Sequence, residues 1–481
     1  MNERNLKIDN MKGVLILLVV IGHMLLPIQG TTRGVTNLFY LIYTFHMPAF
    51  VFLSGLFAQH IYTHVPKAVQ GPAGNRAQRR KHHVAAADAV RPVPSEDRAS
   101  GRAQTAAGRG SRRASRAATN TWTEGHFNWK RCASVLWLYL LFQTLVFFSE
   151  IPAYGRTTRF PDYLHVSGAP WYLLALLLWY LMIPFFDAYR GRVLPHGLPI
   201  LGGLSYSLIV WCLMTIMSLA GGYLVGLHDF LALDRVIAFA PFFFAGYFLG
   251  PERLMKLLGV EPQPCAEARR VYGATAEDVQ AHTPERDVRA VGNTAKSRRK
   301  ETSSRKADRR GSLQSHRLVG TLTVLGLLAF LIIGTQSFDH LLPYRNVVYG
   351  AWYYRFHPEE NPAAFPAGLA THLWLLRLAW MLMAGLMSFA VLVLMPNRQV
   401  PLLTMLGQRT LQIYILHRPI RDLLLAAGVI TAVNPENPVQ VLALIGLSVV
   451  VTVLLSAEIF QKLLSRIQNL PFCSGGRRSC D

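Results

Sequence analysis

The sequence is poor in charge, and acidic residues are especially few. Of its 481 residues only 16% are charged, whereas 51% are hydrophobic, and the mean hydropathy is +0.26. A soluble globular protein is about a quarter charged, so this composition argues against an ordinary soluble enzyme. It also excludes a disordered protein, because long apolar blocks with sparse charge are typical of membrane proteins.

Metal and disulfide motifs are also lacking. The five cysteines, at positions 132, 212, 265, 473 and 480, form no CxxC pair and show no metal-ligand spacing. Neither a zinc site nor a disulfide framework is therefore indicated, and a pair between Cys473 and Cys480 is disfavoured in a reducing cytoplasmic tail. The apolar run 14–21 is not followed by a small-residue cleavage site, so we interpret it as a retained membrane span.

Apolar segments of the length needed to cross a bilayer recur along the chain. A spanning helix needs about 20 mostly apolar residues, and about ten segments meet this test. An even number of spans places both termini on one side. The sequence therefore predicts an all-α integral membrane protein with these spans: 12–29, 37–62, 131–151, 170–188, 198–220, 232–250, 317–336, 372–395, 403–427 and 438–464.

Two polar segments rich in Lys and Arg interrupt this series. Residues 66–126 and 253–316 lack the apolar content that would offset the entropy of ordering them, so we expect both to be largely disordered. They carry much of the excess of 49 basic over 27 acidic residues, and alternation of the spans places them on one face. By the positive-inside rule that face, with both termini, is cytoplasmic. They divide the chain into membrane segments 1–65, 127–252 and 317–481.

The two basic loops allow two interpretations. Nucleic acid or a regulatory protein could bind them, or they could set the topology and attract anionic lipid headgroups. We favour the second, because the electrostatic attraction of juxtamembrane basic segments needs no folded binding site.

His23 is the leading candidate for a functional group inside the membrane. It follows Lys12 by eleven residues. At 100° per residue the two side chains share one helical stripe, with the imidazole about 16 Å further along, near the middle of a core about 30 Å thick. Asp9 lies near the same face. Ionisable groups inside a span are costly, so each is a functional candidate.

Two further histidines occur in predicted spans. His46 should reach the depth of His23, and Pro48 predicts a kink beside it because proline cannot donate to the preceding turn. His417 lies three residues after Tyr414 and faces the same way. The structural alternative is that each histidine simply joins helices by hydrogen bonds.

These blocks resemble the acyltransferase-3 family of integral membrane O-acyltransferases, and within it the fucose 4-O-acetylase-like branch. The similarity is carried by five blocks in order: Asp9-x-x-Lys12-Gly13 with Gly22-His23, Phe45-His46-Met47-Pro48-x-Phe50-Val51-Phe52-x-Ser54-Gly55, Trp171-Tyr172-Leu173-x-Ala175-Leu176, Phe239-x-Pro241-Phe242-Phe243-x-x-Gly246-Tyr247, and the stretch 407–417.

The resemblance implies a donor and an acceptor. The donor would be acyl-CoA, usually acetyl-CoA, as a co-substrate with no bound cofactor, and the acceptor a carbohydrate hydroxyl. It also implies that an Arg and a His separated by ten residues in the first span are central. Here Lys12 replaces the Arg, so it offers a point charge instead of a bidentate fork.

Acyl transfer to a hydroxyl requires a base, a donor to the oxyanion and exclusion of water. We expect His23 to be the base, because burial keeps an imidazole neutral. His46 or Ser54 could orient it or donate to the tetrahedral intermediate. Lys12, with Asp9 at the cytoplasmic mouth, is expected to contact a CoA phosphate. The supporting or acceptor-side candidates are Trp171, Arg409, Tyr414 and His417.

Several alternatives stay open at this point. Transfer could be direct or pass through a covalent acyl-enzyme. A secondary transporter also uses midmembrane histidines as proton relays, although the chain shows no internal repeat. A scaffold with partner-recruiting loops is a third class. We expect a multi-pass protein of the cell membrane. Its expected partners are the bilayer, acyl-CoA, a carbohydrate or lipid-linked glycan of the cell envelope and glycan-assembly proteins, without nucleic acid or metal.

Overall fold

The computed structural model describes residues 5–63, 126–166, 168–187, 205–224, 230–259, 318–335 and 372–469. Of the predicted disordered loops 66–126 and 253–316, only the ends lie within the described residues. There the prediction for 253–257 is wrong, because these residues continue the helix α7. The chain forms two units by its internal contacts, Met1–Gln59 with Trp129–Asp481 and His60–Asn128. In the second unit β1 (Tyr62–Thr63) pairs antiparallel with β2 (His126–Phe127).

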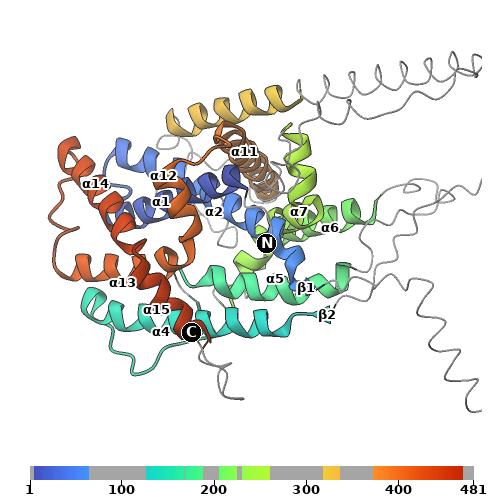
Figure 1. Cartoon of the computed structure of the whole chain (residues 1–481). Coiled ribbons are helices and arrows are strands. Elements are labelled where there is room, and N and C mark those ends of the chain that lie inside the picture. Colours follow the sequence, from blue (N-terminus) through green and yellow to red (C-terminus); the bar gives the residue numbers. More distant parts are fainter. Residues whose placement is uncertain are drawn as a thin grey trace, which may run out of the picture. The chain divides into compact units, whose positions relative to one another are not determined.

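The described part of the first unit is helical, which confirms an all-α membrane protein (Figure 1). Short 3-10 turns, η1 (Leu26–Ile28) and η2 (Ala58–Ile61), follow the first two helices. The helices are α1 (Leu6–Leu25), α2 (Arg33–Phe57), α4 (Trp129–Tyr154), α5 (Trp171–Asp187), α6 (Tyr206–Gly221), α7 (Leu233–Leu257), Leu318–Thr335, α11 (Leu373–Leu394), α12 (Pro401–Gln408), α13 (Thr410–Ala426), α14 (Pro438–Leu455) and α15 (Glu458–Asn469).

Among the described residues, seven helices are long and apolar enough to cross a membrane, and α5 and α6 are apolar but shorter. All the predicted spans contain helix, yet two are not continuous. The predicted span 403–427 breaks at Arg409, whose φ of −115° and ψ of 22° separate α12 from α13. The predicted span 438–464 is also wrong, because α14 ends at Leu455 and the strongly amphipathic α15 begins at Glu458.

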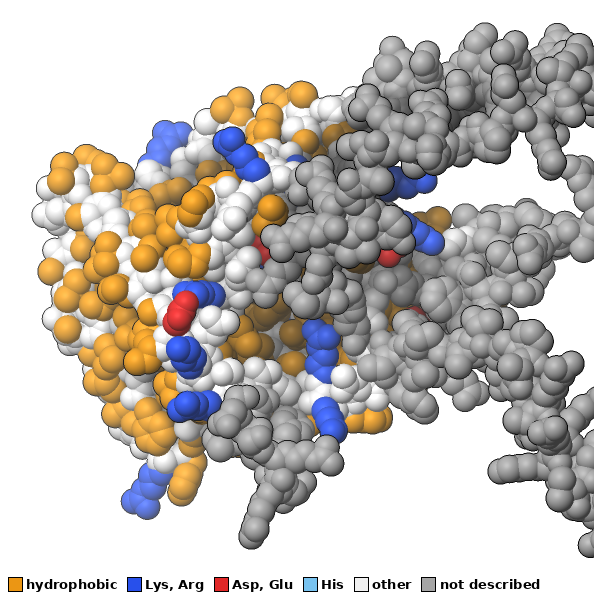
Figure 2. Space-filling view, in the orientation of Figure 1, with side chains coloured by type: hydrophobic (Ala, Val, Ile, Leu, Met, Phe, Trp, Pro, Cys, Tyr) orange, Lys and Arg blue, Asp and Glu red, His pale blue; other side chains and the backbone are white. Residues whose placement is uncertain are grey.

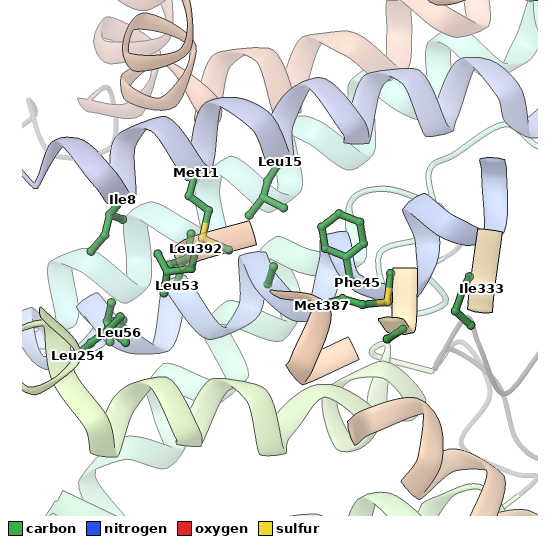
Figure 3. Close-up of a cluster of buried hydrophobic side chains, with 12 residues drawn as sticks. Ile8, Met11, Leu15, Phe45, Leu53, Leu56, Leu254, Ile333, Met387 and Leu392 are labelled. Atoms are coloured by element: carbon green, nitrogen blue, oxygen red, sulfur yellow. The ribbon is translucent and has the colours of Figure 1, made fainter. Parts of the chain in front are cut away.

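A cluster of buried apolar side chains joins α1 and α2, which carry Lys12, His23 and His46, to their neighbours. It draws on α1, α2, α7, α11 and the helix Leu318–Thr335 (Figure 3). α2 contributes residues to the cluster on both sides of Pro48, because the helix continues through the proline to Phe57. The buried members are Ile8, Met11, Leu15, Phe45, Ala49, Leu53, Leu56, Leu254, Ala329, Ile333, Met387 and Leu392.

Polar side chains fix the start of α1 against the end of α11. The buried ammonium of Lys7 donates to the carbonyls of Val393 and Met395 at 2.7 and 2.6 Å. Asn10 donates to the carbonyl of Pro396 at 2.9 Å. A cation at these last carbonyls is favourable, because they carry the negative end of the α11 dipole.

Glycines of the recognised blocks let helix backbones touch. A Cβ on Gly13 would meet the carbonyl oxygen of Leu403, and one on Gly407 would meet the carbonyl oxygen of Asp9. Small residues allow such close approach between membrane helices, so α1 and α12 pack through these two positions. α2 and α7 approach in the same way through Gly55 against Phe243 and Gly246 against Phe52.

Beyond Gln440 in its first turn, the outward side chains of α14 are apolar. Val439, Leu442, Val450 and Leu454 are each more than half exposed. Hydrophobic side chains also dominate this part of the surface in Figure 2, where Asp and Glu are sparse. An exposed apolar face of this kind suits contact with lipid tails.

Candidate active site

His23 points into the helix bundle. Its ring centroid lies 5.0 Å from that of His417 on α13 and 6.3 Å from that of Tyr43 on α2. Tyr43 in turn packs edge-on against His46 at 4.9 Å. The structure therefore brings three predicted site histidines together, with Tyr43 touching both His23 and His46.

His23 lies at a different depth in its span from the one expected from the sequence. The span that holds it runs from Leu6 to Ile28, so it begins earlier than the predicted residue 12. His23 consequently lies in the last turn of α1, nearer the end of the span than its middle. His46 and His417 lie well inside α2 and α13.

His417 is fully buried and its tautomer is defined by its neighbours. Its Nδ1 lies 2.8 Å from the carbonyl oxygen of Tyr414 and 3.1 Å from that of Ile413. A carbonyl can only accept, so Nδ1 carries the hydrogen, and in the neutral ring Nε2 is an acceptor. That Nε2 has no hydrogen-bond partner among the described residues, and the same is true of the buried Nδ1 of His23.

His46 is held in the same manner. Its Nδ1 lies 2.7 Å from the carbonyl oxygen of Ile42, so Nδ1 donates and Nε2 of the neutral ring accepts. The side chain is buried, with 2% of its surface exposed. His46 can thus act on a neighbour only through Nε2.

Lys12 and Asp9 lie at the opposite end of α1 from His23. The Lys12 ammonium sits 4.6 Å from the centre of the Phe57 ring, a cation–π contact with the end of α2. The Asp9 carboxylate accepts a hydrogen bond from the Gln408 amide at 3.5 Å. These two predicted donor-binding residues therefore lie where α1, α2 and α12 meet.

A cavity lies on the stripe between Lys12 and His23. Residues 12, 16, 19 and 23 follow at spacings of four, three and four, which places them on one face of α1. The cavity has a volume of about 140 Å³ and is open on one side. Its lining is almost wholly apolar: Ile16, Val19, Met47, Phe50, Tyr172, Leu173, Leu176, Thr410, Leu411 and Tyr414.

Hydroxyl groups border this cavity. Ser54 donates to the carbonyl oxygen of Phe50 at 2.9 Å, so in its contact with Tyr172 the phenol is the donor. Tyr414 donates to the carbonyl oxygen of Ala169 and packs edge-on against Tyr172, with 5.5 Å between ring centroids. Ser54 and Tyr414 are thus both next to the cavity.

Trp171 begins α5 and stacks on Phe239, with 5.2 Å between the ring centroids and an angle of 27°. The Arg235 guanidinium lies 5.5 Å from the Trp171 ring and donates to the carbonyl oxygen of Gly168 at 3.3 Å. The predicted residue Trp171 therefore belongs to an aromatic and cationic corner at the start of α5.

Arg409 is not brought to the histidines. It donates to the carbonyl oxygen of Ser456 at 2.7 Å and pairs with the Glu458 carboxylate at 3.2 Å. These contacts join the break between α12 and α13 to the start of α15. Its contacts therefore support the helix arrangement, and its role on the acceptor side stays a prediction.

A buried ion network lies beside His417 and was not predicted from the sequence. Arg418 donates to Glu150 on α4 at 2.8 Å and to Asp422 at 3.0 Å, and Arg421 pairs with Asp422. Ser149 donates to Asp422 at 3.0 Å. The signal was present, since three charged residues follow His417 within one apolar stretch, two of them at i, i+4 spacing.

Comparison with known protein families gives a match to an acyltransferase family. The acyltransferase-3 family model, described as an acyltransferase domain, matches residues 5–260, more than half of the 481 residues. The match contains Lys12, His23 and His46 and ends before His417. No curated protein and no solved structure matches the chain.

Proposed function

Because the chain belongs to the acyltransferase-3 family and is a multi-pass membrane acyltransferase, we propose that it transfers an acetyl group from acetyl-CoA to a carbohydrate hydroxyl. The observation that carries this proposal is the single face of α1 on which Lys12, the apolar cavity and His23 follow one another. A donor with a charged end, a long thin arm and a reactive thioester requires these three features in this order.

The donor end of the site is the Lys12 end. The ammonium can meet a phosphate of CoA as a point charge. From Lys12 to His23 the helix rises about 16 Å, and the apolar lining along this path suits an extended arm and excludes water. Since acyl-CoA is made in the cytoplasm, the proposal places the Lys12 end and both termini on the cytoplasmic side of the cell membrane.

The chemistry at the other end is acyl transfer. The acceptor hydroxyl gives its proton to a neutral nitrogen of His23 while its oxygen bonds to the thioester carbon. The tetrahedral intermediate collapses, the carbon–sulfur bond breaks, and the CoA sulfur leaves with the proton held by His23. The hydroxyls of Ser54 and Tyr414 are the candidates to donate to the developing oxyanion, and each would first have to give up its bond to the carbonyl of Phe50 or Ala169.

The acceptor side is assigned to the aromatic residues Trp171, Tyr172 and Tyr414, which contact one another in turn and lead to His417 beside His23. Aromatic faces suit the apolar faces of sugars, and Arg235 beside Trp171 offers hydrogen-bond donors. The resemblance of the motif blocks to fucose 4-O-acetylases supports a sugar hydroxyl. A lipid-linked glycan of the cell envelope, presented with glycan-assembly proteins, fits an acceptor that reaches a site within the bilayer.

Thiol release tests this function. Purified protein is mixed with acetyl-CoA and candidate sugars or lipid-linked sugars, and free CoA is measured for wild type and for His23→Ala. We expect acceptor-dependent release that His23→Ala abolishes. His165→Ala, in an exposed loop with its side chain 60% accessible, should behave as wild type. Absence of release with every acceptor, together with proton-coupled uptake into vesicles, would favour a transporter instead.

A further inference from the structure

Two buried imidazole nitrogens face this site without partners. The Nδ1 of His23 and the Nε2 of His417 have no hydrogen-bond partner among the described residues, and their rings lie 5.0 Å apart. A buried polar atom is normally hydrogen-bonded, so two neighbouring exceptions need a common explanation. One proton held between the two rings would satisfy both atoms.

The position of that proton follows from His417. The carbonyls of Tyr414 and Ile413 hold its hydrogen on Nδ1, so Nε2 of the neutral ring can only accept. The shared hydrogen must then belong to Nδ1 of His23. The structure holds no bond between these two nitrogens, but the ring centres are only 5.0 Å apart, and rotation of the His23 ring can bring its Nδ1 within hydrogen-bonding distance of Nε2 of His417.

Resting on the function proposed above, we propose that His417 is a positioning residue for His23. By accepting from Nδ1–H, it orients the His23 ring and fixes its tautomer. The lone pair of His23 is then on Nε2, which is the nitrogen that takes the proton from the acceptor hydroxyl. This is the role that the third member of a catalytic triad has toward its histidine.

The surroundings of His417 suit a fixed acceptor. Its side chain is fully buried. The next residue, Arg418, ties α13 to Glu150 of α4 at 2.8 Å and to Asp422 at 3.0 Å. Because these contacts are buried, they hold α13 in place at the residue next to His417. The imidazole of His417 is therefore a fixed partner that can orient the His23 ring.

The tautomer of His23 tests the proposal without any assay of activity. Full-length protein with ¹⁵N-labelled histidine is placed in lipid bilayers, and the His23 signals are assigned by their loss in His23→Gln. We expect the proton on Nδ1 in wild type and a shift toward Nε2 in His417→Asn. A proton on Nε2 in wild type, or an unchanged tautomer in His417→Asn, would overturn the proposal.

Two matched substitutions test the same role in catalysis. The amide of His417→Asn can replace Nδ1 but provides no acceptor at the Nε2 position, whereas the carbonyl of His417→Gln reaches that position. We expect His417→Asn to lower kcat about 100-fold with KM for acetyl-CoA unchanged, and His417→Gln to restore most of it. Equal rates for the two variants would contradict the assignment. If wild type were inactive toward every acceptor, the proposed function would be refuted. The tautomer measurement would still decide whether His417 positions the His23 ring.

Discussion

Arg418 of α13 donates to Glu150 of α4 across 2.8 Å, and both side chains are buried. The same guanidinium donates to Asp422, so one cation neutralises carboxylates of two helices. This contact fixes the helix that carries His417 and Tyr414 against the helix before the Trp171 corner. The stability of the site should therefore depend on a residue that takes no part in the chemistry.

Removal of Arg418 should destabilise the protein strongly. In Arg418→Ala, Glu150 keeps only its pair with Arg156 and Asp422 only its pair with Arg421. The loss should therefore approach the cost of breaking a buried ion pair, about 3–5 kcal/mol. The apparent melting temperature in detergent should fall by many degrees. Arg466→Ala, at an exposed position of α15, should leave it unchanged. Partial recovery in Arg418→Met with Glu150→Gln would confirm that the buried carboxylate left with fewer partners is the cause.

Gly407 should be intolerant of any side chain. In Gly407→Ala the new Cβ meets the backbone carbonyl of Asp9, so α12 must move away from α1. Overpacking of this kind typically costs about 1–3 kcal/mol. Gly446→Ala on α14 is the matched control, because no heavy atom lies within 4 Å of its added Cβ. Equal melting temperatures for the two variants would show that the close approach does not matter.

Lys12 should act on donor binding and not on the chemical step. Lys12→Met removes the charge while keeping the packing on Phe57, so KM for acetyl-CoA should rise about 10- to 100-fold, the worth of a charge-assisted hydrogen bond. kcat should change little, and Lys12→Arg should stay close to wild type. Steady-state kinetics with varied acetyl-CoA gives both constants. A loss confined to kcat would contradict a role in phosphate binding.

Filling the cavity should block the donor. Val19→Phe places a ring in the lining between Lys12 and His23. We expect the rate of acetyl transfer to fall. The rate with donors of longer acyl chains should fall further, because these donors need more of the same space. Val450→Phe makes the same change on the exposed face of α14 and should have no effect. A variant Val19→Phe with normal rates for all donors would place the arm elsewhere.

The sequence predicted the parts of this arrangement that depend on local periodicity. The helical stripe of Lys12 and His23 required only the rise and turn of an α-helix, and the apolar runs predicted the helices. It did not predict the break at Arg409, because that residue adopts a non-helical conformation fixed by tertiary contacts with Ser456 and Glu458.

The pairing of helices was also beyond the sequence pattern. The sequence placed His46 at the depth of His23, yet the ring 5.0 Å from His23 is that of His417. Tyr43 contacts both His23 and His46. Spacing along a helix shows which side chains share a face, not which distant helix will cover that face. For the same reason Glu150 escaped notice, since its partner Arg418 is 268 residues away.

The central claim is that His23 is the base for acyl transfer. Rapid-quench measurement of labelled acetyl transfer, at saturating acetyl-CoA and acceptor, tests it most directly with His23→Gln, which keeps a side chain of similar reach. The account predicts a rate constant for transfer at least about 100-fold below that of wild type, with acetyl-CoA still bound at wild-type affinity. Transfer at the wild-type rate by His23→Gln would contradict it.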